Sequence, residues 1–596
     1  MNATKKAIAA CLLLICSDLA GATRAAVREG ASPGSQNASH ALQALLAEYW
    51  QDHLFENPQD ATAFGDKRFN DRWSDLSEEA RSRALHRSAD FARRLHAISA
   101  AGLSRQENLS ADLLRRALLE YQDSAQFKEW ETPVNQIHGI HIDLPQLVAV
   151  TPFDDEKDYK NYIHRLRRLP LLFGQLTEDM RQGIRDKRVQ PAVVSDRVLA
   201  QVEAIISAGR GESPFVAPLT RFPDTITPEH RVRIAKAVNQ AVTTEVIPAY
   251  RSLAQFLRTE YIPSGRTDPG IWAIPEGNAY YAFCIRRNTT LDMSADEIHK
   301  IGLEEVRRDE AAMLQIAKEL GYLDLKSFGA AIGIDPKLHA ATRQQILELY
   351  RSALNQMAPK LPELFGLLPK ASLIVEATPA YTEKQRPSAT YEPGTSDGKR
   401  PGRVVVNTFD YAHISLADAE SIAYHEGIPG HHLQFSIAQE LQGIPEFRKH
   451  MEYTAYTEGW AMYAEQLGKE VGSYQDPHSD YGRLEEDIRR AIRLVVDTGL
   501  HAKHWTRQQV VDYFHEHSSI DETNVQRETD RYIAWPGQAL GYKIGQLKLL
   551  EFRQRAQASL GSRFDIKKFH DLVLDSGAVP LDILGTQVDQ WIATQQ

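Results

Sequence analysis

The stretch "SLADAESIAYHEGIPGHHLQFSIAQEL", residues 415–441, decides both the expected fold and the expected site. Its apolar residues recur at helical spacing and carry a helix through His425. A histidine four residues later would lie about 40° away around the helix and would share a metal ion with His425. That position is Pro429, which removes an amide donor and clashes with the carbonyl of residue 425. We therefore expect the helix to kink or bulge here.

Two histidines follow the proline and compete for the role of second ligand. On a straight helix His432 is nearly in line with His425 but about 10 Å further along the axis. If residues 427–430 form a bulge that holds two extra residues, His431 takes the i+4 position instead. The flanking glycines favour His431, with His432 as the alternative ligand. A His432 that is not a ligand would lie beside the site.

A downstream segment supplies the remaining parts of a hydrolytic metal site. Such a zinc site has three protein ligands and one open position, so Zn²⁺ is the cofactor that the pattern predicts. The helical stretch "YTAYTEGWAMYAEQL", residues 453–467, supplies Glu458 as third ligand and Glu465 two turns later. Glu426 would then be the base that accepts a proton from the attacking water. A His-His pair alone is more often a packed or solvated edge, but three histidines in eight residues favour the metal site.

The rest of the chain predicts a mostly α-helical protein with little β-structure. Helical periodicity dominates from about residue 42 to the end. The exception is "GRVVVNTFD", residues 402–410, which is short and β-branched and therefore a strand candidate. The net charge is −10, with no basic surplus, so no nucleic-acid partner is expected.

The N-terminus predicts export. Two lysines precede a short apolar run, and Ala-Gly-Ala at 20–22 fits a cleavage site, so residues 1–22 are expected to be a signal peptide and 23–40 a linker. The residue before Cys16 is isoleucine, which does not favour lipid attachment. No segment is long enough to span a membrane. The expected location is periplasmic or secreted, and the mature chain keeps only Cys284, so it has no internal disulfide.

Three motifs carry a family resemblance: "HEGIPGHHLQ", "TEGWAMYAEQL" and "RYIAWPGQALGYKIG". They resemble the bacterial family called domain of unknown function 885. That family in turn resembles helical gluzincin peptidases such as thimet oligopeptidase, oligoendopeptidase F and carboxypeptidase Taq. The resemblance implies a two-lobed helical fold, with an N-terminal lobe at 41–270 and a zinc-peptidase lobe at 271–596. A small β-sheet edge would lie beside the zinc helix, in a deep cleft that admits short peptides.

The resemblance also assigns roles to single residues. His425 and Glu426 match the start of the gluzincin zinc helix, and His431 matches its end with two residues inserted. Glu458 and Glu465 match the two glutamates of the later helix. Tyr542 matches a tyrosine that stabilises the oxyanion. The sequence departs from the pattern at Gln538 and Gln546, where the peptidases have a histidine and a second tyrosine.

Further candidates come from local patterns. Asp497 and His501 are i,i+4 neighbours, so the carboxylate would hold His501 protonated and aimed at the oxyanion, unless the two are an ordinary surface pair. Arg531 would bind a substrate carboxylate, or else form a surface ion pair. An exposed strand at 403–408 would add a peptide as a further strand, flanked by Tyr391 and Asn407.

The sequence thus predicts an exported zinc metallopeptidase that hydrolyses short peptides. One alternative is an inactive, peptidase-like protein that binds peptides or metal. Glu426 argues against it, because a protein without turnover needs no base beside the metal. A second alternative is a metal amidase with a non-peptide substrate, which the sequence does not distinguish from a peptidase.

Overall fold

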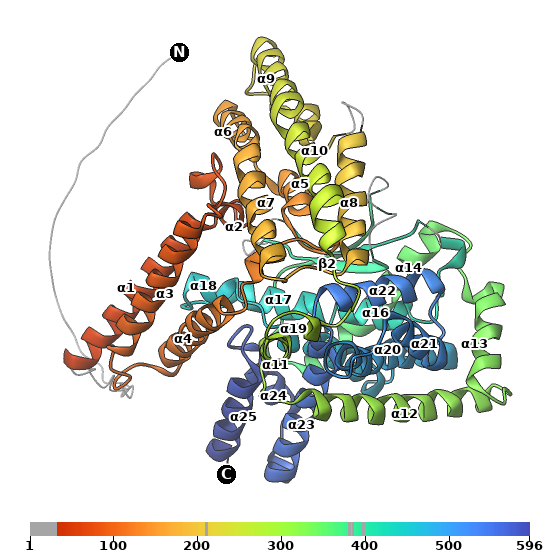
Figure 1. Ribbon diagram of the computed structural model, residues 1–596. Helices are drawn as coiled ribbons and strands as arrows, with labels where there is room; N and C mark the ends of the chain where they lie inside the picture. The colour runs from red at the N-terminus through yellow and green to blue at the C-terminus, as the bar shows by residue number, and fades with distance from the viewer. Residues whose placement is uncertain are drawn as a thin grey trace, which may run out of the picture.

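The structure is a computed structural model that describes residues 33–208, 213–379, 383, 387–395, 400–409 and 411–595. The predicted signal peptide lies outside the described residues. The described chain is mostly helical with one small sheet, as the sequence predicts (Figure 1). Residues 33–40 of the predicted linker belong to the first helix. Among the described residues, no helix combines the length and apolar character that crossing a bilayer requires.

The N-terminal half consists of helices of moderate length. They are α1 (Pro33–Glu56), α2 (Pro58–Ala63), α3 (Glu78–His96), α4 (Arg105–Ala125), α5 (Ile140–Val150), α6 (Glu156–Arg167), α7 (Leu169–Arg185), α8 (Ala192–Ser207), α9 (Pro228–Ala241), α10 (Ile247–Phe256) and α11 (Gly277–Thr289). Ser77 and Ser104 start α3 and α4 by accepting hydrogen bonds from backbone amides, as N-cap serines do.

The C-terminal half begins with the long helix α12, which runs along the lower edge of Figure 1. Its helices are α12 (Ala295–Glu319), α13 (Leu325–Ile334), α14 (Arg343–Met357), α15 (Leu361–Leu364), α16 (Ala419–Glu426), α17 (His431–Glu440), α18 (Glu446–Lys449), α19 (Thr454–Glu470), α20 (Pro477–Ala502), α21 (Arg507–His517), α22 (Glu522–Ala534), α23 (Leu540–Leu560), α24 (Ile566–Leu574) and α25 (Leu581–Gln595).

The hydrophobic cores do not follow the predicted division at residue 270. Buried residues between 134 and 261 form a core of their own, built from α5 to α10. Leucines of α1, α3 and α4, between 42 and 118, instead share a core with residues 340–592. The first helices of the chain therefore pack with the C-terminal half, and the separate core of the N-terminal half begins only after residue 130.

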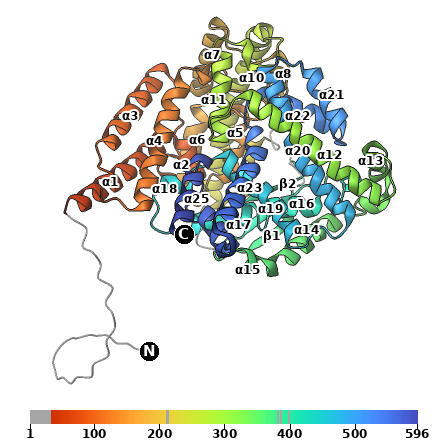
Figure 2. The same cartoon turned by 90° about the horizontal axis from the view of Figure 1, so that it is seen from below.

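The sheet seen among the described residues has three strands: β1 (Leu373–Ala377), β2 (Ala389–Glu392) and β3 (Gly402–Val406). Their order is β1-β3-β2, with β3 parallel to β1 and antiparallel to β2. The predicted strand is therefore present, but it lies in the middle of the sheet, so the expectation that it offers an exposed edge is wrong. The free edges belong to β1 and β2, and Figure 2 shows β2 beside α16.

Close packing of α19 against α23 positions two of the site helices. A Cβ atom at Gly545 would lie 1.9 Å from the carbonyl oxygen of Ala455, and one at Gly459 would lie 2.5 Å from Gly545. Only glycine permits backbones to approach so closely. This contact brings Tyr542, on the first turns of α23, toward Glu458 of α19.

Candidate metal centre

The zinc-like motif folds as two helices joined by a tight turn. Helix α16 ends at Glu426 and α17 begins at His431, with a cis peptide bond between Ile428 and Pro429. A Cβ atom at Gly430 would lie 2.0 Å from the carbonyl oxygen of His425. Only glycine fits at this position, because the backbone of the preceding helix approaches so closely. The sequence had suggested a bulge within one helix, whereas the structure has an interrupted helix. The turn still places His431 beside His425.

The structure brings together the three predicted ligands. His425 Nε2 lies 3.4 Å from Glu458 Oε2, and His431 Nε2 lies 3.5 Å from the same oxygen. The two imidazole rings stand nearly perpendicular, at 85°, with centroids 4.8 Å apart. One donor atom of each residue lies within 4.8 Å of the others. Tetrahedral ligands at about 2.0–2.1 Å from Zn²⁺ lie about 3.4 Å from one another, so this donor set fits the ion.

Glu465 supports one of the two histidines. Its Oε1 lies 2.7 Å from His425 Nδ1, and its Oε2 accepts a hydrogen bond of 2.6 Å from Ser421. This carboxylate fixes the ring orientation and leaves Nε2 facing Glu458, which is the usual arrangement behind a metal-bound histidine. Ser421 was not predicted, although its place four residues before His425 puts it on the same helix face.

His431 lacks comparable support. Its Nδ1 is buried and has no hydrogen-bond partner among the described residues. The ring instead packs edge-on against Phe435, with centroids 5.8 Å apart. His425 is therefore the more firmly held member of the pair, and His431 is oriented by packing and by its contact with Glu458.

The charges of the centre favour a cation. Burial lowers the pKa of His425, but the carboxylates of Glu458 and Glu465 outweigh burial and hold it well above its ordinary value. Burial raises the pKa of Glu458, but its bonds to the two histidines hold it well below the ordinary value. Burial also raises the pKa of Glu426, and the charge of Glu458 adds to that effect. A proton on His425 thus supplies positive charge where a bound ion would bring it.

His432 points away from the three ligand atoms. Its Nδ1 lies 3.1 Å from the Tyr391 hydroxyl and its Nε2 lies 3.1 Å from the carbonyl oxygen of Ala371. Because a carbonyl only accepts, Nε2 carries the proton, and the tyrosine hydroxyl donates to Nδ1. Burial lowers the pKa of His432 to about 4, so the ring is neutral. His432 therefore ties β2 to the segment that precedes β1.

The two residues predicted to flank a peptide groove have different places. The backbone N–H of Tyr391, on edge strand β2, lowers the pKa of Glu426, so the free edge of the sheet faces the predicted base. Asn407 follows β3 and donates a hydrogen bond of 2.6 Å to the carbonyl oxygen of Glu383. Tyr391 thus lies next to the candidate metal centre, whereas the hydrogen bond of Asn407 stabilises a neighbouring loop.

Arg531, Gln538 and Tyr542 form one cluster. Arg531 donates to Gln538 Oε1 at 2.7 Å and to the Tyr542 hydroxyl at 3.3 Å. Arg493 lies over the Tyr542 ring, 4.6 Å from its centroid. Burial and the charge of Glu458 raise the pKa of Tyr542, so the hydroxyl lies within electrostatic reach of the predicted ligand. No linear motif marked Arg493, because tertiary packing alone places α20 beneath this tyrosine.

Asp497 and His501 do not form the predicted pair. The amide of Ile271 donates to His501 Nδ1 at 3.0 Å, and Nε2 lies 3.0 Å from the carbonyl oxygen of Tyr532. Asp497 instead accepts from the Tyr281 hydroxyl at 2.6 Å. Burial lowers the pKa of His501 to about 3 and raises that of Asp497 to about 7. A neutral histidine with both nitrogens engaged by backbone does not fit the role of a charged oxyanion donor.

The sequence matches a family described as "Bacterial protein of unknown function (DUF885)" over residues 58–588. The chain belongs to this family. Membership in DUF885 agrees with the resemblance seen in the three motifs, and it does not by itself specify an activity. No curated protein matches the sequence.

Among the solved structures that resemble this DUF885 chain, two illustrate the match. One is described as "the putative lipoprotein from Colwellia psychrerythraea", with 29% identity, a TM-score of 0.88, and coverage of 94% of this chain and 100% of that one. The other is described as "a putative lipoprotein of unknown function from Shewanella oneidensis", with 17% identity, a TM-score of 0.69, and coverage of 93% and 99%. The second shows the shared fold only.

Proposed function

We propose that this DUF885 protein is a zinc-dependent peptidase of the gluzincin type that acts on short peptides. The observation that carries the proposal is the convergence of His425, His431 and Glu458, with both histidine nitrogens 3.4–3.5 Å from one Glu458 oxygen and Glu426 directly after the first ligand. Two imidazoles and one carboxylate are the donor set of many hydrolytic zinc sites. A two-lobed gluzincin architecture is part of the same proposal.

When bound, the ion would supply a Lewis acid that polarises a carbonyl and acidifies water. Glu426 accepts the proton of the attacking water and later returns it to the leaving amine. Burial raises the pKa of this carboxyl, which suits a group that must hold a proton between the two steps. Glu465 keeps the His425 ring oriented throughout.

The arginine–tyrosine cluster supplies the remaining polar groups. The Tyr542 hydroxyl, polarised by Arg531, is the candidate donor to a developing oxyanion. Arg531 lies beside it and offers a positive charge for a substrate carboxylate. Because Glu528 pairs with Arg493 at 3.0 Å and with Arg531 at 3.5 Å, the cluster is only partly neutralised.

The free edge of β2 is the candidate surface for an extended peptide. Tyr391 is fixed there by its bond to His432, and its backbone faces Glu426. A peptide that pairs with this edge would lie along the predicted base. An extracytoplasmic location also belongs to the proposal, since the sequence predicts a signal peptide and the structure with 29% identity is described as a "putative lipoprotein".

The decisive experiment combines metal analysis with a peptide-library digest on the purified mature protein. We expect about one zinc per chain and cleavage of short peptides. Glu426→Gln should retain the metal and lose at least a hundredfold in kcat/KM, since the base acts on water and not on the ion. Glu348→Gln, an exposed change on α14, is the matched control. A Glu426→Gln protein with near-normal turnover would refute the proposal.

A further inference from the structure

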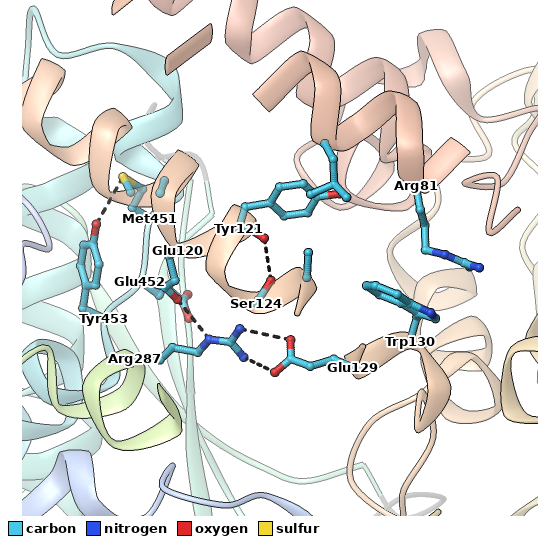
Figure 3. Close-up of a pocket in the computed structure, with 13 residues that line it drawn as sticks. Arg81, Glu120, Tyr121, Ser124, Glu129, Trp130, Arg287, Met451, Glu452 and Tyr453 are labelled. Carbon is cyan, nitrogen blue, oxygen red and sulfur yellow. Dashed lines mark hydrogen bonds and ion pairs between the residues drawn. The ribbon is translucent and has the colours of Figure 1, made fainter. Parts of the chain in front are cut away.

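A cavity of about 490 Å³ opens next to the segment that leads into α19, in the range of volumes typical of ligand sites. Its lining comes from α3, α4, residues 129–130, α11 and residues 451–453 (Figure 3). The cavity therefore lies between the N-terminal helices and the segment that leads into α19, the helix of Glu458.

The lining carries more negative than positive charge. Arg287 bonds Glu120 at 3.1 Å and Glu129 at 2.7 Å, so one guanidinium is shared by two carboxylates, as Figure 3 shows. Arg81 is neutralised by Asp179 outside the cavity, at 2.8 Å. Glu452 is exposed into this space and forms no hydrogen bond or ion pair with the described residues. The cavity thus holds three carboxylates. Only one of its guanidinium groups, that of Arg287, is not neutralised by a group outside the cavity.

Glu452 also connects the cavity to the metal centre. It stands two residues before α19 and six residues before Glu458. Burial raises the pKa of Glu452. The charge of Glu458 raises this pKa further, whereas His431 lowers it. Glu452 therefore lies within electrostatic reach of two predicted ligands while lining the cavity. A ligand held by Glu452 would therefore sit at the segment that leads into the helix of Glu458.

The remaining wall is apolar or aromatic. Leu85, Ala117 and Tyr121 contribute hydrophobic surface, and Tyr121 is 45% exposed. Trp130 presents a ring on which the Arg81 guanidinium already lies, 5.2 Å from the centroid. Such a wall suits the methylene stem of a long cationic side chain, whose charged end then reaches a carboxylate.

We propose that this cavity is the subsite for a positively charged group of the peptide, an ammonium or guanidinium, with Glu452 as its counter-charge. The inference rests on the proposed peptidase function and gives it a substrate class: short peptides with a basic group next to the cleaved bond. Glu120 and Glu129, which share one arginine, keep the cavity negative around that group.

The test compares paired substrates on the zinc-loaded protein. N-acetylated alanine pentapeptides carry one lysine at each position in turn, and each has a norleucine counterpart of nearly equal length. An all-alanine peptide with a free amino terminus forms a separate arm. Glu452→Gln should reduce kcat/KM at least tenfold for one lysine position, or for the free-amino peptide, and change the norleucine series by less than twofold.

Two further variants complete the test. Glu452→Asp keeps the charge and should restore most of the preference. Glu446→Gln, an exposed change six residues earlier, alters net charge equally and should have no effect. An equal loss on lysine and norleucine peptides, or no loss on any cationic peptide, overturns the inference.

Binding separates this inference from the proposed function. Calorimetry with the Glu426→Gln protein measures affinity for the lysine and norleucine peptides without turnover. If the wild-type protein cleaves no peptide but still binds lysine peptides through Glu452, the peptidase proposal fails and the cationic subsite stands. If cleavage occurs without dependence on Glu452, the peptidase proposal stands and the subsite fails.

Discussion

His425 Nδ1 lies 2.7 Å from Glu465 Oε1, while Nε2 of the same ring lies 3.4 Å from Glu458 Oε2. One imidazole thus connects two glutamates seven residues apart on α19, one as expected ligand and the other as support. The residue that aims the ring is as specific a feature of the site as the ligand itself.

Glu465→Gln is therefore expected to weaken zinc binding without emptying the site. Support of this kind is worth about 10–100-fold in metal affinity, because the amide orients and polarises the ring less well. The measurement is competitive titration against a chelator of known affinity. The fold should persist, since Ser421 still bonds residue 465. Unchanged zinc affinity would show that the Glu465 contact does not tune the metal.

His431→Ala and His432→Ala should separate ligand from neighbour. His431 faces Glu458 at 3.5 Å, so its loss should remove most of the bound zinc. His432 faces Tyr391 and Ala371, so its loss should leave zinc in place and loosen the β2 edge, raising KM for peptides. Zinc content by elemental analysis decides between them. Zinc lost from the His432 variant alone would reverse the assignment.

His501→Ala should reduce stability and spare metal binding. The change leaves the N–H of Ile271 and the carbonyl of Tyr532 without partners in a buried position. We expect the free energy of unfolding to fall by about 2–5 kcal/mol. Denaturant unfolding measures this, and zinc content of the folded fraction should equal that of the wild type. A stable variant with impaired turnover would restore the catalytic role that the sequence suggested.

The same residue predicts a pH dependence. His501 has a pKa of about 3 in the folded state against an ordinary 6.5, so below about pH 6.5 the unfolded state binds a proton that the folded state does not. Its contribution is complete above that pH and is lost as pH falls toward about 3. Asp497, with a pKa raised to about 7, acts in the opposite direction between about pH 4 and 7.

Comparing the wild type with His501→Ala isolates the histidine from Asp497. The stability difference between the two proteins should be smaller at about pH 5 than at about pH 7.5, by about 2 kcal/mol. Unfolding curves at both pH values provide the measurement. An equal difference at both would mean that His501 is not held neutral.

Gly430→Ala should disrupt the turn that places His431. The added methyl carbon would lie 2.0 Å from the His425 carbonyl oxygen and 2.3 Å from that of Tyr424, so backbone must move. Lower zinc affinity and a lower Tm are expected. Gly174→Ala, on α7 with nothing within 4 Å of the added atom, is the matched control and should be neutral or stabilising. Normal zinc affinity in the Gly430 variant would contradict the packing argument.

The sequence alone determined the helical class, the one strand beside the motif, and the identity of the three residues that converge. These follow from local rules: hydrophobic period, β-branched runs, and the exclusion of a regular helix by Pro429. The i+4 logic selected His431, and the structure places it beside His425 even though the chain breaks the helix and does not bulge it, because either route returns residue 431 to the face of His425.

Tertiary structure alone decided which neighbours each polar group meets. Asp497 and His501 share a helix face, yet the histidine forms its hydrogen bonds with backbone groups of residues 271 and 532 instead. The predicted edge strand became the central strand because β1 and β2 pair on both sides of it. Glu452 and Arg493 carried no signal, since their roles arise from segments far apart in the chain. Local periodicity fixes which face a residue occupies, whereas only packing fixes what lies opposite that face.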